Sequence, residues 1–288
     1  CRLEARGVAA GDLQVTQDRE GRFAVLVSLE SKPEPEVCVN VIEPVLKGVL
    51  GVPLKAPRTA GCEEGRCTLR FCQQEGLAVK AGFACGAKNG ESGDNHGLHH
   101  ISCGKYMAAL SDGMGTGHRA SRESGAIVNL LSDFLDAGFE KEVAVKLINS
   151  IMVMKSVDEA FATVDMCVID LYTGEVEFIK NGAEPSYIRG KKGTETVRAA
   201  SLPVGIMSGV EVQSFAHRVE PGDTIVMVSD GVEVREGHEG WIRRMVDMCQ
   251  RNMPPQELAE RIMEKSMALK GGEADDDRTV IVLQMEEG

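Results

Sequence analysis

Aromatic residues and long apolar runs are both scarce in this chain. Phe, Trp and Tyr make up 4% of its 288 residues, so the core must be built mainly from aliphatic side chains and methionine. The most apolar stretch, residues 37–54, is interrupted by Glu43, Pro44, Lys47 and Pro53. A helix that crosses a bilayer needs about 20 predominantly apolar residues. The sequence as given therefore predicts a soluble protein.

The chain also lacks an excess of positive charge. It has 32 Lys and Arg against 44 Asp and Glu, which gives a formal net charge of −12. Nucleic-acid-binding proteins usually present a basic patch, and anionic membrane surfaces attract one. The composition therefore argues against nucleic acid as a partner. Bound cations can neutralise clustered carboxylates, which otherwise repel one another.

Paired cysteines and a start signal are missing as well. The nine cysteines are scattered, with no Cys-x-x-Cys pair, which is typical of a reducing compartment. The sequence begins at Cys1, without an initiator methionine or a signal-peptide pattern. We therefore expect a piece of a longer protein, and expect this piece to be cytoplasmic.

What the sequence does contain divides it into two parts. Residues 1–78 predict a small α+β subdomain, with a hairpin formed by residues 11–16 and 22–29, a helix over 36–49 and a strand over 66–72. Residues 79–288 predict a second, larger domain. It opens with a strand at 79–86 and a Gly-rich loop at 87–97.

The second part alternates strand and helix patterns. A strand at 106–110 is followed by two amphipathic helices, and then by strands at 163–170, 176–181, 186–189, 212–218 and 224–229. Helical patterns return around Trp241 and after Pro255, before a closing strand at 279–285. The short turns between the middle strands predict an antiparallel sheet.

Three of these strands lie next to an aspartate in a polar or Gly-rich turn. Asp112 follows the strand at 106–110, Asp230 follows the strand at 224–229, and Asp276 precedes the closing strand. Strand ends that converge can bring such distant carboxylates together. Hard oxygen ligands of this kind suit Mg²⁺ or Mn²⁺. Two such ions can hold a bridging water for in-line attack on a phosphoryl group, and Gly113 can offer its backbone carbonyl.

Three motifs carry a resemblance to a known family. They are the run from Ser111 to Gly117 (SDGMGTG), the Ser229-Asp230-Gly231 turn, and the closing run from Asp275 to Val280 (DDDRTV). In order and context they resemble the protein phosphatase 2C superfamily, and within it the sporulation stage II protein E phosphatases of endospore-forming bacteria. The resemblance covers essentially the whole chain. It implies an α+β fold: an antiparallel β-sandwich flanked by helices in α-β-β-α layers, preceded by a small regulatory subdomain.

The resemblance also implies the roles of individual residues. Asp112, the central catalytic residue, would bridge two Mn²⁺ or Mg²⁺ ions, Asp94 and the Gly113 carbonyl would bind one ion, and Asp230 and Asp276 would bind the other. Asp277 is an alternative to Asp276, because Asp277-Arg278 stands where the superfamily often has Asn-Met. No arginine is assigned a phosphate-binding role.

A mobile switch element is implied in addition. The two helices between Arg119 and Met154 would correspond to the family's switch, together with the loop from Ser156 to Ala162. Their movement would complete the metal site.

The implied activity is a metal-dependent serine phosphoprotein phosphatase. Its substrate would be a phosphoserine on an anti-anti-sigma factor, whose dephosphorylation activates a sporulation sigma factor. The full-length family members are membrane-anchored at the division septum, so we also expect contact with the cell-division machinery through the N-terminal region, and self-association. The alternative is a catalytically silent resting form that acts as a regulatory or oligomerisation module.

A histidine cluster follows Asp94 at His96, His99 and His100. One of these side chains is a candidate general acid for the leaving serine alkoxide, because histidine titrates near neutral pH. The other interpretation is that they are exposed loop histidines.

Overall fold

The computed structural model describes the chain as two compact units, Cys1–Glu75 (unit 1) and Gly76–Gly288 (unit 2). It describes all residues except 1, 18–19, 31–32, 56–60, 64–65, 89, 102–103, 116, 156–160, 235–237 and 273–274. No helix in the described part is long and apolar enough to cross a membrane.

Unit 1 is an antiparallel sheet packed on one short helical segment. Its strand order is β1-β2-β5-β3, with β4 pairing β5 (β1 Ala10–Gln17, β2 Phe23–Leu29, β3 Leu54–Lys55, β4 Gly61–Glu63, β5 Arg66–Gln73). The helical elements are η1 (Glu4–Arg6), α1 (Pro35–Val37), the π-helical turn η2 (Cys38–Ile42) and α2 (Glu43–Leu50). The predicted hairpin is confirmed by the β1–β2 pairing. The short strands β3 and β4 were not predicted.

The core of unit 1 lies between this sheet and α2. Alternate residues of β2, including Val25, Val27 and Leu29, are buried against Val45 and Leu46. Alternation sends every second side chain to the same face of a strand, so one face of β2 suffices to bury the apolar stripe of the helix.

Unit 2 contains two five-stranded antiparallel sheets. The first has the order β13-β10-β9-β8-β7 (β7 Asp94–Ile101, β8 Lys105–Asp112, β9 Val164–Asp170, β10 Glu175–Asn181, β13 Gln213–Arg218). The second has the order β12-β11-β14-β15-β6 (β6 Leu77–Gly86, β11 Ser186–Gly190, β12 Gly193–Val197, β14 Thr224–Val228, β15 Arg278–Glu287).

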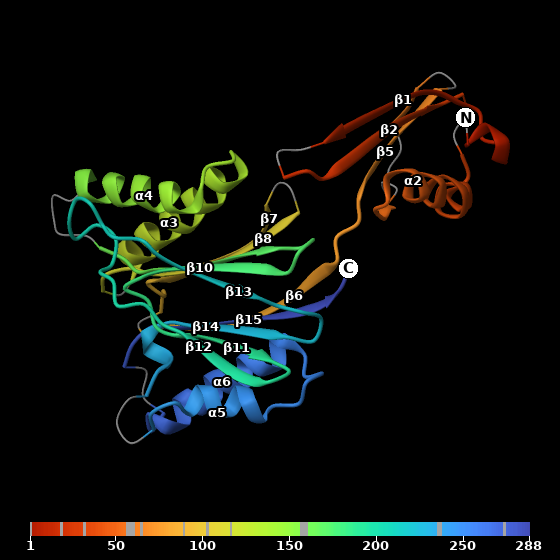
Figure 1. The fold of residues 1–288 in the computed structure, drawn as a ribbon. Coiled ribbons are helices and arrows are strands. Elements are labelled where there is room, and N and C mark those ends of the chain that lie inside the picture. Colours follow the sequence, from red (N-terminus) through yellow and green to blue (C-terminus); the bar gives the residue numbers. More distant parts are fainter. Residues whose placement is uncertain are drawn as a thin grey trace. The chain divides into compact units, whose positions relative to one another are not determined.

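Helices cover the outer face of each sheet. Figure 1 shows α3 (His118–Asp136) and α4 (Lys141–Lys155) on the first sheet, and α5 (Trp241–Met248) and α6 (Pro255–Leu269) on the second. The short helix η3 (Asp230–Val232) follows β14. These four layers confirm the predicted α-β-β-α sandwich. Short connections join the antiparallel neighbours β7 and β8, β9 and β10, and β11 and β12, whereas the other neighbouring strands of unit 2 are connected through helices or further strands.

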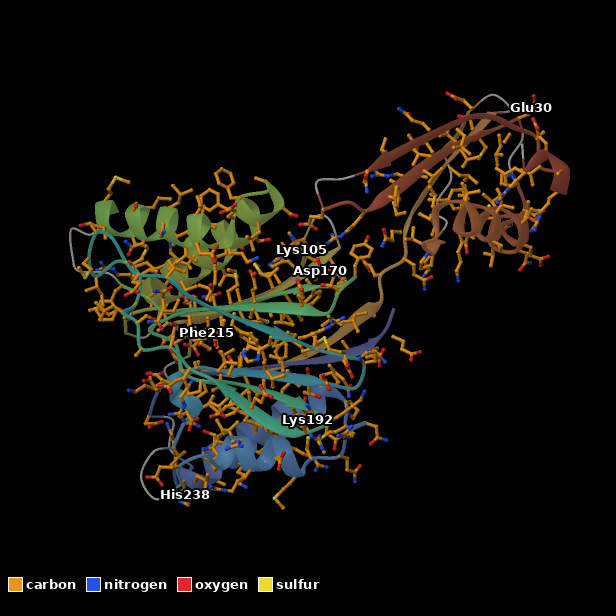
Figure 2. The ribbon with its side chains drawn as sticks, viewed as in Figure 1. Glu30, Lys105, Asp170, Lys192, Phe215 and His238 are labelled. Carbon is orange, nitrogen blue, oxygen red and sulfur yellow. The ribbon has the colours of Figure 1, made fainter. Side chains whose placement is uncertain are left out.

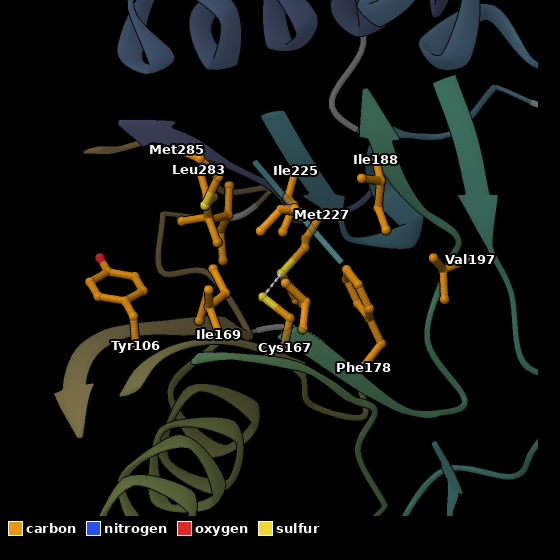
Figure 3. Packing of buried hydrophobic residues seen from close by; sticks show 14 of the residues in the cluster. Tyr106, Cys167, Ile169, Phe178, Ile188, Val197, Ile225, Met227, Leu283 and Met285 are labelled. Atoms are coloured by element: carbon orange, nitrogen blue, oxygen red, sulfur yellow. Dashed lines mark hydrogen bonds between the residues drawn. The ribbon is translucent and has the colours of Figure 1, made fainter. Parts of the chain in front are cut away.

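The core between the two sheets is mostly aliphatic, as the shortage of aromatic residues predicted. Figure 3 shows Cys167, Ile169 and Phe178 of the first sheet facing Met227 and Leu283 of the second. The intervening residues of β9, such as Met166, point the other way and pack under α3 and α4. Burial on both faces explains why residues 166–169 of this strand are all apolar; Asp165 is a buried charged exception.

One predicted loop is wrong. Residues 94–97, expected in a Gly-rich loop, form the start of β7, which pairs with β8 along its whole length. This strand can contain polar residues because β7 is an edge of the first sheet. Lys105 and Asp170 mark the far end of β8 and β9, where Figure 2 labels them, and Asp112 lies at the opposite end of β8.

The cysteines are mostly free. Cys38, Cys72, Cys85, Cys167 and Cys249 carry free thiols, and Cys67 is disulfide-bonded. The expectation of unpaired cysteines therefore fails at Cys67.

Candidate metal centre

Two predicted ligands, Asp94 and Asp112, face each other across the β7–β8 pair. They are directly opposed in the antiparallel register, at the first residue of β7 and the last of β8. Asp94 is buried, and neither of its carboxylate oxygens has a hydrogen-bond partner among the described residues. Burying an ionised carboxylate without a partner costs free energy, so a bound proton or cation would stabilise Asp94.

Asp112 is fixed from its other side by Thr163. The Asp112 amide donates to Thr163 Oγ1 (2.9 Å), and its carbonyl accepts from the Thr163 amide (2.9 Å). The hydroxyl of the preceding Ser111 donates to the Thr163 carbonyl at 2.7 Å. These bonds fix the backbone of Asp112 between β7 and the start of β9, and this restricts where its carboxylate can lie.

Gly113 is required by the close approach of α3. A Cβ atom at this position would lie 2.5 Å from the carbonyl oxygen of Ala120, which belongs to the first turn of the helix. The Gly113 amide donates to the Gly93 carbonyl at 3.3 Å, and Gly113 forms an isolated bridge with Ala162. The residue that would lend its carbonyl to an ion is therefore held between β7, α3 and residue 162.

The second sheet contributes Asp230, which lies just after β14, where hydrogen bonds join the end of β14 to the start of β15. The Ser229 amide donates to the Thr279 carbonyl (3.0 Å), and the Thr279 amide donates to Ser229 Oγ (2.8 Å). Asp230 then begins η3 and is exposed. At Gly231, an added Cβ would overlap the carbonyl oxygen of Asp277. This crowding brings the Asp230 turn directly against the acidic run before β15.

Within that run the three described aspartates have different surroundings. Asp275 pairs with Lys270 (2.9 Å) and Arg278 (3.1 Å). Asp277 is buried and accepts two backbone amides, from Lys88 (2.7 Å) and Gly93 (2.7 Å), one on each oxygen. Asp276 is half-buried, and one of its oxygens accepts only the next amide along the chain. Of the two alternatives, Asp276 is the one with oxygens left to bind an ion.

The electrostatics join these aspartates into one cluster. Burial, followed by the negative charges of Asp94 and Asp230, raises the pKa of Asp112 to about 8, and Asp276 adds to the rise. Burial also raises the pKa of Asp94 to about 6, although the nearby hydroxyls of Ser229 and Thr279 oppose the rise. Carboxylates that repel one another in this way are stabilised by a bound cation.

The donor set fits hard divalent cations. It consists of carboxylate and backbone carbonyl oxygens, which Mg²⁺ and Mn²⁺ prefer, and it lacks thiolates. Among the described residues, no group of three or more His, Cys, Asp or Glu side chains is close enough to hold one ion. Asp112, Asp230 and Asp276, the three carboxylates predicted for one ion, are therefore not close enough together in this structure to hold it by themselves, and waters would complete its coordination.

Helix α3, part of the predicted switch, is bonded to the strand that carries Asp94. Ser124, fully buried, donates to the Gly93 carbonyl at 2.6 Å. The Asn95 amide group donates to Ser124 Oγ (2.9 Å) and to the Ser121 carbonyl (2.8 Å). Both residues flanking Asp94 are thus held by α3. Sequence reasoning missed Ser124 and Asn95, because only the β7 register shows that they meet.

The rest of the predicted switch is described in part. The two helices are observed as α3 and α4, and residues 156–160 of the loop lie outside the described residues. At the end of the loop, the Met114 amide donates to the Phe161 carbonyl at 3.1 Å, and Ala162 and Val204 exchange two backbone hydrogen bonds. The segment after α4 therefore contacts the same turn that follows Asp112.

The histidine cluster is turned toward other groups. The His96 ring lies 4.3 Å from the Phe83 ring (centroid to centroid), and its Nδ1 is 3.7 Å from the Cys85 thiol. Burial lowers the pKa of His96. His100 packs edge-on against Tyr106. The described contacts of His96 and His100 are with rings and a thiol, so they do not assign a general acid.

A buried ion pair near the site was also missed. Lys180 Nζ lies 2.7 Å from Asp165 Oδ1, and their side chains are 0% and 1% exposed. Asp165 also accepts from the hydroxyl of Ser186 (3.2 Å), which belongs to the other sheet. Asp165 is paired with Leu110, two residues before Asp112. The sequence did offer a signal for this pair, because Asp165 of β9 and Lys180 of β10 are charged residues at positions whose neighbours in the alternation within each strand are apolar.

The two-sheet sandwich with carboxylates gathered at converging strand ends defines a phosphatase of the protein phosphatase 2C type. The model of the stage II sporulation protein E family matches residues 102–286. The chain belongs to this family.

Individual relatives agree with that assignment. The chain is 36% identical over 257 residues to stage II sporulation protein E of Priestia megaterium, covering 86% of this chain and 44% of that protein. It therefore spans less than half the length of this relative.

Solved structures have the same fold. The phosphatase domain of SpoIIE from Bacillus subtilis, with a fragment of its regulatory domain, matches with a TM-score of 0.76 and 30% identity over 99% of this chain and 85% of that chain. The catalytic domain of the serine threonine protein phosphatase PstP, in complex with two manganese ions, matches with a TM-score of 0.59 and 16% identity over 73% of this chain and 100% of that chain. At that identity the likeness to PstP concerns the fold alone.

Proposed function

We propose that this chain hydrolyses phosphoserine on a protein substrate and depends on two divalent cations, Mn²⁺ or Mg²⁺. The observation that carries the proposal is the carboxylate cluster: Asp94 and Asp112 are opposed in register, both have raised pKa values, and the charges of Asp230 and Asp276 reach Asp112. The manganese complex of PstP, which has the same fold, supports the choice of ions.

The ligands divide between the two sheets. Asp112 would contact both ions, Asp94 and the Gly113 carbonyl would hold one, and Asp230 and Asp276 would hold the other. Asp276 is preferred to Asp277 because both oxygens of Asp277 already accept backbone amides. When bound, such a pair of ions activates a water and neutralises charge on the phosphoryl group.

The chain's own residues orient the site. Thr163 holds the backbone of Asp112, and Ser229 and Thr279 hold the turn that carries Asp230. Gly113 permits the turn after Asp112 to pack closely against α3, and Gly231 permits the Asp230 turn to pack closely against Asp277. The site is therefore preorganised by backbone hydrogen bonds rather than by long flexible side chains, which limits the entropy lost on binding.

The substrate and partners of this proposal follow the family. The substrate would be a phosphorylated anti-anti-sigma factor, and its dephosphorylation would activate a sporulation sigma factor. Unit 1 would be the end of the regulatory region and would contribute to self-association and to contact with the cell-division machinery. The full-length protein would be membrane-anchored at the division septum, with these two units in the cytoplasm.

Helices α3 and α4 would control the site. Ser124 and Asn95 join α3 to both neighbours of Asp94, so a shift of the helix would move this ligand. The chain would then change metal affinity through backbone position, without replacing any ligand.

A second candidate function is favoured by one observation. No three of the described acidic, histidine or cysteine side chains are close enough to hold one ion. This arrangement suits a silent resting form that acts as a regulatory or oligomerisation module until the switch moves.

The test is Mn²⁺-dependent release of phosphate from a phosphoserine protein, comparing wild type with Asp112→Ala and with the matched control Glu264→Ala. Glu264 is an exposed residue of α6, away from the cluster. We expect metal-dependent activity in wild type and in Glu264→Ala, and its loss in Asp112→Ala. Absence of activity in wild type at high Mn²⁺ would favour the silent form, and activity that survives Asp112→Ala would contradict the two-metal proposal.

A further inference from the structure

The second sheet of unit 2 has an edge strand at each side, and both are closed by side chains. At β6, the Gln256 amide group of α6 accepts from the Phe83 amide (3.1 Å) and donates to the Phe83 carbonyl (3.0 Å). At β12, Arg243 Nε of α5 donates to the Thr194 carbonyl at 3.0 Å. Exposed edges recruit foreign strands, so such caps prevent unwanted pairing.

In the described part of unit 1, strand β1 is an edge without such a cap from another element. It pairs only with β2 among the described strands, and all its residues from Gly11 to Gln17 are exposed. Two hydrogen bonds show which backbone amides and carbonyls of β1 point away from β2. The Leu13 amide donates to Asp12 Oδ1 (2.9 Å), and the Phe23 amide of β2 turns away from β1 to Gln73 of β5 (3.4 Å).

Both bonds point the same way. Phe23 is paired with Gln17, and Leu13 is paired with Val27, so the odd-numbered residues of β1 direct their backbone groups away from β2. Val15 and Gln17 therefore present backbone amides and carbonyls at the open edge. A further strand can bond there without disturbing the β1–β2 ladder.

An apolar groove lies beside this edge. Leu13 and Val15 of β1 line it together with Val45, Val49 and Leu50 of α2, and its volume is about 440 Å³. Leu13, Val15 and Val49 are 40%, 45% and 59% exposed, which is unusual for three large apolar side chains around one hollow. Alternate side chains of a strand added to β1 would enter this groove.

The mouth of the groove is basic. Arg2 lines it, and Arg2 and Arg6 together line an adjoining hollow that shares Val45 and Gly48. Both arginines are exposed, and neither guanidinium has a hydrogen bond or ion pair with another described residue. Unpaired positive charge beside an apolar groove favours an occupant that combines apolar and acidic residues.

We propose that the β1 edge and the β1–α2 groove bind an extended apolar and acidic segment of a partner protein by strand addition. Backbone bonds to Val15 and Gln17 would supply affinity, alternate apolar side chains would fill the groove, and Arg2 and Arg6 would select acidic residues. This is the usual division of labour in β-augmentation. The surface does not involve the carboxylate cluster, so it does not depend on the phosphatase proposal.

The test measures anisotropy of a labelled nine-residue peptide, Glu-Glu-Val-Thr-Val-Thr-Val-Glu-Glu, titrated with the 288-residue chain at low salt. The comparison peptide replaces each Glu with Lys. We expect the acidic peptide to bind about tenfold more tightly, and the double variant Arg2→Glu/Arg6→Glu to reverse that order. These two arginines are exposed, so the reversal is measured in a folded protein.

A second variant tests the backbone. Val15→Pro removes an outward amide but no bond to β2, and should weaken binding of the acidic peptide about tenfold while the thermal unfolding of unit 1 changes little. Equal binding of the two peptides, or binding that neither variant alters, would overturn the proposal. So would absence of binding together with a dimer, seen by sedimentation, that Val15→Pro dissociates, because the edge would then belong to a second copy of this chain.

Discussion

Replacing Asp112 with asparagine is expected to stabilise the metal-free protein while abolishing its activity. Burial and the charges of Asp94 and Asp230 raise the pKa of Asp112 from 3.8 to about 8. Each pKa unit corresponds to about 1.4 kcal/mol, so full ionisation of Asp112 would cost ~6 kcal/mol of stability if Asp94 kept its charge. Asp112 is only partly buried, so screening by solvent lowers this cost. We therefore expect Asp112→Asn to raise the free energy of unfolding by about 2 kcal/mol at pH 8.

The sign of the pH dependence follows from the raised pKa. Below about pH 4 the carboxyl group is protonated in both the folded and the unfolded chain, and it contributes nothing to stability. As the pH rises from there toward about 8, the unfolded chain loses the proton while the folded chain keeps it, so the wild type loses stability. The advantage of Asp112→Asn should therefore grow with pH across this window and level off above it.

Urea unfolding in the presence of a chelator measures this advantage. Trp241 is the only tryptophan and is buried in α5, so its fluorescence reports unit 2 without interference from unit 1. Glu264→Gln is the control, because Glu264 is exposed on α6 and is not one of the clustered carboxylates. Equal stability of Asp112→Asn and wild type at pH 8, or a gain that does not depend on pH, would refute the reasoning.

Three further outcomes are expected. Asp277→Asn should lower the free energy of unfolding by about 2 kcal/mol, because two buried backbone amides lose their carboxylate. Asp276→Asn should not destabilise the metal-free protein, because it removes a charge that repels Asp112, and should remove the stabilisation by Mn²⁺; the reverse pattern would assign Asp277 as the ligand. Ile148→Ala, in the buried face of α4, should change Mn²⁺ affinity or turnover in a domain that remains folded, with the exposed Met154→Ala as control, and unchanged kinetics would dismiss the switch. Lys180→Met should lower the free energy of unfolding by about 3–5 kcal/mol, because it leaves the buried charge of Asp165 without a partner. The double variant Lys180→Met/Asp165→Leu should recover most of this loss in a urea titration. No recovery would show that the ion pair itself stabilises the sandwich.

The elements that the sequence predicted well are those set by local pattern. The alternating hairpin of unit 1, the amphipathic helices α3 and α4 and the strand before Asp112 depend on periodicity within one segment. The strand-end position of Asp112 and Asp230 could be read in the same way. The role of Asp94 came from the family resemblance, whereas the position of Gly113 directly after Asp112 already suggested its carbonyl as a ligand.

What could not be predicted depends on register between distant segments. The choice between Asp276 and Asp277 turns on Lys88 and Gly93, which lie more than 180 residues away and donate their amides to Asp277. Residues 94–97 looked like a loop because their polar composition hid an edge strand. The Asp165–Lys180 pair is visible only once β9 and β10 are aligned and the inward positions are known.

The place of β15 in the second sheet has a consequence for biosynthesis. This strand, the last along the chain, lies between β14 and β6, and β6 is the first strand of unit 2. Until the ribosome has translated β15, β6 lacks the only strand that pairs with it among the described strands, and Asp276 is not yet in place. A nascent chain therefore cannot assemble this metal centre early. A prematurely terminated product would leave the backbone groups of β6 unpaired and open to chaperones and proteases.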